Sequence, residues 1–192
     1  MERRAGARRG IGDLLLAPDA SRPEQAVVYA AALTATALTL VAGAHAGLAW
    51  WALLVTAVIA FDVVGGAVAH ALPSVTRRFH RPGRSARHRL AFVAAHVHPF
   101  VLALVLPDLG WASAALIYGG VLGGAVLTAL TPPALRLVVA VAVTAAGTAV
   151  LLTIAPVPSP VTWLAPLLLL KLVLGHVADG ARQRSPAGAA TS

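Results

Sequence analysis

Apolar residues run through this chain in six long blocks, which are separated by short polar or Pro- and Gly-rich stretches. A helix needs about 20 mostly apolar residues to cross the hydrocarbon core of a bilayer, and each block reaches or approaches that length. The sequence therefore predicts an all-α membrane protein, a bundle of about six transmembrane helices. The predicted helices cover residues 26–44, 48–72, 88–106, 111–130, 134–154 and 161–177.

The stretches between the blocks divide the chain into one membrane domain and two tails. Residues 1–25 are predicted to form a basic cytoplasmic tail, residues 26–178 the transmembrane domain, and residues 179–192 a disordered cytoplasmic tail. The longest loop, 74–89, contains the helix breaker Pro82-Gly83. No block between the tails is long and polar enough to form a separate extramembrane domain.

Arginine is distributed asymmetrically, which predicts the orientation of the helices. Cytoplasmic loops retain Lys and Arg, and an N-terminus inside places every arginine inside and none in the outer turns. We therefore expect both termini in the cytoplasm and a location in the plasma membrane. The arginines of the long loop are expected to contact anionic lipid headgroups: Arg77, Arg78, Arg81, Arg84, Arg87 and Arg89.

Composition supports the membrane assignment and excludes several chemistries. The chain is 58% apolar and 11% charged, whereas soluble domains are about 45–50% apolar and about 25% charged. It has no cysteine, which excludes disulfides, Fe–S clusters and thiol nucleophiles. The net charge of +8 does not indicate nucleic acid, because the arginines lie in tails and loops. Abundant Ala, Gly, Pro and Arg with a single Lys indicate a bacterial source with a GC-rich genome.

Glycines within two predicted helices indicate close helix packing. Two overlapping G-x-x-x-G patterns occur in helix 111–130, and a Gly pair occurs in helix 48–72. The partner of the first set is another helix of this chain, a second protomer of a homo-oligomer, or a partner membrane subunit. The residues are Gly119, Gly120, Gly123 and Gly124 in the first set and Gly65 and Gly66 in the second.

Asp62 and Lys171 are charged residues inside apolar blocks, and we expect them to pair. Asp62 lies about 21 Å from the outer end of its helix at 1.5 Å per residue. A carboxylate there costs about 2.5–3.5 kcal/mol to insert and should face the bundle interior with a partner. Lys171 lies about 15 Å from its outer end, and Asp62 is the one acid at comparable depth. The pair could also fix helix register without any further role.

Histidines extend this set toward the inner end of the bundle. His96 lies near the depth of Asp62, whereas His98 is about 200° away on a regular helix, so only one of them is expected in the site. We favour His96 and take Asp62, His96 and Lys171 as candidate catalytic residues. Three further histidines from three helices share one depth and are candidate metal ligands, for a transition metal or haem: His70, His88 and His176. Each of these could equally be an interface residue.

Several motifs resemble those of small multi-pass membrane proteins of actinobacterial type that have no assigned function. They are Phe61-Asp62-x-x-Gly65-Gly66, the loop Arg78 to Gly83, His88, His96-Val97-His98-Pro99, and Trp163 to Pro166 followed by Lys171 and Gly175-His176. The resemblance implies a membrane fold and no mechanism. The sequence carries no nucleophile elbow, no P-loop and no dinucleotide-binding glycines.

The sequence leaves four functions open for the polar pocket formed by the Asp, His and Lys residues. The first is acid–base or metal-assisted chemistry on a lipid-soluble small molecule. The second is proton-coupled transport of a small molecule or ion. The third is metal or haem binding, and the fourth is a structural or accessory role in a membrane complex.

Overall fold

The computed structural model describes residues 20–72 and 86–177, and within these ranges all regular structure is helical. Six helical segments are long and apolar enough to cross a membrane. The predicted number of such helices and the all-α class are thereby confirmed. Residues 1–19 of the predicted N-terminal tail, residues 178–192 and most of the basic loop lie outside the described residues, including Arg77, Arg78, Arg81 and Arg84.

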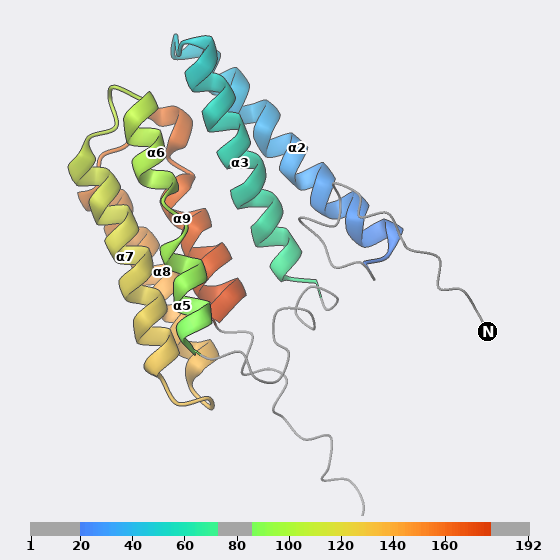
Figure 1. Ribbon diagram of the computed structural model, residues 1–192, viewed down its shortest axis with the longest axis vertical. Coiled ribbons are helices and arrows are strands. Elements are labelled where there is room, and N and C mark those ends of the chain that lie inside the picture. The colour runs from blue at the N-terminus through green and yellow to red at the C-terminus, as the bar shows by residue number, and fades with distance from the viewer. Residues whose placement is uncertain (1–19, 73–85, 178–192) are drawn as a thin grey trace, which may run out of the picture.

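The first two spans form a helical hairpin, α2 (Arg22–His45) and α3 (Trp50–His70), along one side of the bundle (Figure 1). α2 begins four residues before its predicted start because Ser21 and Glu24 form a reciprocal capping box. Gly47 makes the turn between the helices with a φ of 73°, a conformation that favours glycine. A Cβ at Gly65 would lie 3.2 Å from the Cβ of Ala32, so the two helices pack closely there.

The third span is broken into α5 (Ala86–Ala94) and α6 (His98–Val105), where the sequence predicts one continuous helix. It is followed by α7 (Trp111–Leu130) and α8 (Arg136–Ile154). Gly120 and Gly124 of α7 face Leu151 and Val143 of α8. The face of α7 that carries Gly119 and Gly123 is open, with nothing within 4 Å of a Cβ built at either position.

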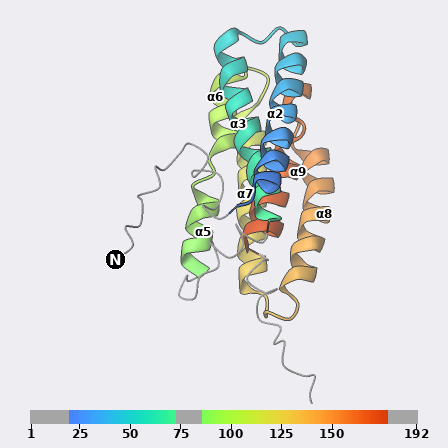
Figure 2. The same ribbon diagram turned by 90° about the vertical axis from the view of Figure 1, so that its right-hand side faces the viewer.

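The sixth span changes helix type along its length. It starts with the 3₁₀ turn η1 (Ser159–Val161), continues as α9 (Leu164–Leu168) and ends as the π-helix η2 (Leu169–Val177). This span is the most buried of the six, and η2 packs against α3, α7 and α8 (Figures 1 and 2). It therefore forms the centre of the bundle.

Tryptophan and arginine mark opposite ends of the bundle. Trp50 and Trp51 begin α3, Trp111 begins α7, and Trp163 directly precedes α9, all at the end that carries the α2–α3 turn (Figures 1 and 2). The opposite end, with the α7–α8 turn, carries the described arginines. They are Arg22, Arg87, Arg89 and Arg136.

Candidate functional site

Lys171 of η2 forms an ion pair with Asp62 of α3 in the interior of the bundle. Its Nζ lies 2.6 Å from Oδ2 of Asp62 and also donates to the backbone oxygen of the same residue at 3.2 Å. Asp62 is about 18 Å along α3 from Trp50 and about 12 Å from His70 at 1.5 Å per residue. The pair inferred from helix depth is present.

Gly66 makes room for this contact. It lies one turn after Asp62 on α3, and a Cβ at this position would collide with Cε of Lys171 and lie 2.9 Å from its Nζ. The lysine side chain therefore crosses α3 directly over the glycine. A larger residue at Gly66 would keep the ammonium away from the backbone oxygen of Asp62.

Pro99 explains the break between α5 and α6. Proline has no N–H, and its ring clashes with the carbonyl four residues earlier, here that of Ala95. The carbonyls freed by the break find other donors. Nδ1 of His96 is 2.7 Å from the oxygen of Phe92, and the hydroxyl of Tyr118 on α7 donates to the oxygen of Ala94 at 2.9 Å. Because a carbonyl only accepts, Nδ1 of His96 carries the hydrogen and its Nε2 remains an acceptor in the neutral ring.

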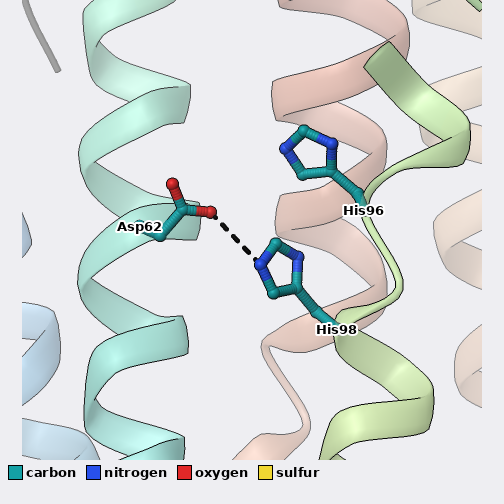
Figure 3. Close-up of side chains that lie close together, drawn as sticks. All are labelled: Asp62, His96 and His98. Carbon is teal, nitrogen blue, oxygen red and sulfur yellow. Dashed lines mark ion pairs between the residues drawn. The ribbon is translucent and has the colours of Figure 1, made fainter. Parts of the chain in front are cut away.

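Both His96 and His98 point from this break toward Asp62 (Figure 3). Nε2 of His98 lies 3.5 Å from Oδ2 of Asp62, and one ligand atom from each of the three residues falls within 4.8 Å of the others. The expectation that only one of the two histidines reaches the site is wrong, because the non-helical residues 95–97 remove the 200° offset. We call Asp62, His96, His98 and Lys171 the Asp62 cluster.

The members of the Asp62 cluster differ in exposure. The Lys171 side chain is 4% exposed, that of His98 is 23% exposed and that of Asp62 is 38% exposed. Nδ1 of His98 is buried without a hydrogen-bond partner in the described part of the chain. The carboxylate is therefore the more exposed charge of the pair, and the ammonium is shielded from solvent.

The three histidines predicted as metal ligands are placed differently from one another. His70 and His176 are buried with ring centroids 5.3 Å apart, whereas His88 is exposed near the start of α5. The sequence did not single out Phe92, whose ring contacts both His96 and His176, with centroids 4.6 Å and 4.3 Å away. Phe92 lies one helical turn before His96, and this spacing was the signal in the sequence that could have placed Phe92 beside the site.

The Asp62 cluster has the geometry of three metal ligands but carries an opposing charge. Two imidazoles and a carboxylate are a frequent ligand set for divalent transition metals. In this structure Oδ2 of Asp62 already accepts a hydrogen bond from the Lys171 ammonium. With neutral imidazoles, the cluster therefore has no net negative charge to offset a dication in a medium of low dielectric. A proton adds one positive charge rather than two, so the cluster accepts it at a lower electrostatic cost than a dication.

Comparison with family models, with curated protein sequences and with solved structures finds no match to this chain. The resemblance noted from the sequence motifs therefore stays a prediction.

Proposed function

We propose that this chain is an integral membrane protein with both termini in the cytoplasm, and that it couples the movement of a small cation to the movement of protons. Tryptophan is enriched at membrane interfaces and cytoplasmic ends are rich in Arg. The end with the four tryptophans would then face outward, and the end with Arg22, Arg87, Arg89 and Arg136 would face the cytoplasm.

The observation that carries the proposal is the broken third span beside an ion pair whose lysine is buried. Non-helical backbone at membrane depth is tolerated where it is buried in protein or lines a polar cavity, and transporters often bind substrate at such breaks. Here the break presents His96 and His98 to Asp62 near the middle of the bundle. Ionisable residues at that depth are costly and are typical of ion and proton pathways.

A cationic solute fits the exposure of the two charges. Asp62 is the accessible charge of the pair, while Lys171 is nearly fully buried. A cation that approaches the carboxylate would compete with the Lys171 ammonium for the same oxygen. Transfer of a proton out of the cluster would keep the local charge constant when the cation binds, which couples the two movements.

The test is proton flux in proteoliposomes that contain a trapped pH-sensitive dye. Sodium, potassium and choline are added one at a time outside, and flux is compared with protein-free vesicles. We expect at least one cation to drive proton movement through the wild-type protein, and Asp62→Asn to reduce the flux to that of empty vesicles. The matched control is Asp108→Asn, an exposed acid between α6 and α7. Flux through Asp62→Asn equal to wild type would reject the proposal.

Chemistry on a lipid-soluble molecule, assisted by a bound metal, is the second candidate. It is favoured by the proximity of the ligand atoms of Asp62, His96 and His98. Elemental analysis of untagged protein purified without chelators separates the two candidates. The transport proposal predicts well below one transition metal per chain. A full equivalent that Asp62→Asn removes would favour the metal-assisted function instead.

A further inference from the structure

A second pair of histidines lies between the Asp62 cluster and the arginine-rich end of the bundle. His70 ends α3 and His176 lies in the last turn of η2, and the two residues are 6% and 3% exposed. Histidines at helix ends in a membrane are ordinarily explained as interface residues in contact with headgroups. Burial to this degree does not fit that explanation. We call His70 and His176 the inner histidine pair.

Close helix packing brings the inner histidine pair together. A Cβ at Gly175 would lie only 2.9 Å from Cβ of His70, so α3 approaches η2 directly over this glycine. The same two helices meet again at Gly66, under the side chain of Lys171. The α3–η2 contact thus carries two ionisable pairs, one at each glycine.

Phe92 of α5 lies between the Asp62 cluster and the inner histidine pair. Its ring centroid is 4.6 Å from that of His96 on one side and 4.3 Å from that of His176 on the other. His96 continues to His98 at 5.2 Å, and His176 continues to His70 at 5.3 Å. Four imidazoles from α3, the α5–α6 break and η2 therefore belong to one series of neighbouring rings, in which Phe92 contacts His96, His176 and, at 6.4 Å, His70.

We propose that the inner histidine pair is a second proton-binding site, through which the Asp62 cluster exchanges protons with the cytoplasmic side, and that Phe92 separates the two sites. This inference rests on the proposed proton-coupled function. In one step an imidazolium of the inner histidine pair loses an N–H proton, and the neutral Nε2 of His96 gains it. One imidazole becomes neutral while the other becomes charged, and the total charge is unchanged.

The phenyl ring of Phe92 sets the condition for this step. It has neither a proton donor nor an acceptor, so a proton crosses only when the ring leaves the space between the imidazoles and water enters. The charged groups on the elements around the path are Asp62 on α3, Lys171 on η2, and Arg87 and Arg89 on α5, of which Arg87 is exposed. Asp62 and Lys171 form the ion pair described above, so their charges offset each other at that end of the path.

The test uses the same proteoliposomes with His70→Gln, His176→Gln and the double variant. The matched control is His45→Gln, an exposed histidine at the last residue of α2, at the other end of the bundle. We expect the double variant to slow cation-driven proton flux by about a hundredfold, the lower end of what a positioned proton donor contributes. His45→Gln should leave the flux unchanged. An unchanged flux and pH profile in the double variant would overturn the inference.

Phe92→Ala provides a second test, because the result expected for this variant would not arise if Phe92 had a purely structural role. The variant keeps the backbone oxygen that accepts from His96 but removes the ring between the sites. We expect a proton leak without any added cation, because the path stays open. A leak no greater than in wild type would overturn the inference even if the histidine variants fail to fold. If Asp62→Asn retains wild-type proton flux, the proposed function fails and this inference fails with it. If Asp62→Asn loses the proton flux but the double histidine variant keeps it, only the role of the inner histidine pair is rejected.

Discussion

On its way to Asp62, the side chain of Lys171 passes directly over Gly66, where a Cβ would collide with it. The lysine needs this space for two hydrogen bonds, one to Oδ2 and one to the backbone oxygen of Asp62. Both bonds form across the space that Gly66 leaves free.

Gly66→Ala should therefore destabilise the protein although Ala is the better helix former. The added methyl group collides with Cε of Lys171, and overpacking of this kind costs about 1–3 kcal/mol. Thermal unfolding in a fixed detergent measures the effect. The control is Gly119→Ala, at an open position that should be neutral or slightly stabilising. Equal melting temperatures for the two variants would contradict the contact.

Removing one partner of the ion pair should cost more at Asp62 than at Lys171. Asp62→Asn leaves a buried ammonium without its carboxylate, and an uncompensated buried charge costs about 3–5 kcal/mol. Lys171→Met leaves a carboxylate that is 38% exposed and close to His98, so the loss should be smaller. The double variant should recover part of the stability of Asp62→Asn. Chemical denaturation of the three variants measures the order, and a larger loss for Lys171→Met would contradict it.

Replacement of Pro99 should abolish proton flux without lowering the stability of the protein. Pro99→Ala restores an N–H that can bond to the oxygen of Ala95, so α5 and α6 can join into one helix. We expect unchanged or higher thermal stability together with loss of proton flux, because His96 and His98 can no longer both face Asp62. Pro156→Ala, at an exposed loop position after α8, is the control. Wild-type flux in Pro99→Ala would show that the break is not required.

The absence of cysteine allows a direct test of orientation. Single cysteines are introduced at Ala46, in the turn between α2 and α3, and at Thr131, in the turn between α7 and α8. In intact cells an impermeant maleimide should label the cysteine at position 46 and should label that at 131 only after the membrane is permeabilised. The reverse pattern would invert the proposed topology.

The sequence predicted the six apolar helices and the partner of Asp62 because both follow from depth and hydropathy along single helices. Asp62 and Lys171 are ionisable residues at matching depth, and a bilayer leaves such residues few alternatives to pairing. Positions along separate helices are enough for that argument, and no knowledge of helix rotation is needed.

The arrangement of the site was not predictable where the backbone departs from a regular α-helix. The exclusion of His98 assumed 100° per residue through residues 95–97, although Pro99 was a visible signal for a break. The π-helix at Leu169–Val177 also changes the rotation of Lys171 and His176, and no residue type marks it. Grouping His88 with His70 and His176 by depth alone ignored which face of its helix carries each residue.

His96 has two roles that share one ring. Its Nδ1 hydrogen holds the carbonyl of Phe92 at the joint between α5 and α6, while the rest of the ring faces the Asp62 cluster. Rotation of this side chain would release the carbonyl and loosen the joint at the same moment as it withdraws the imidazole from Asp62. The same residue thus stabilises the joint of the third span and belongs to the proposed cation site, so occupancy of that site would be coupled to the angle between the two half-helices.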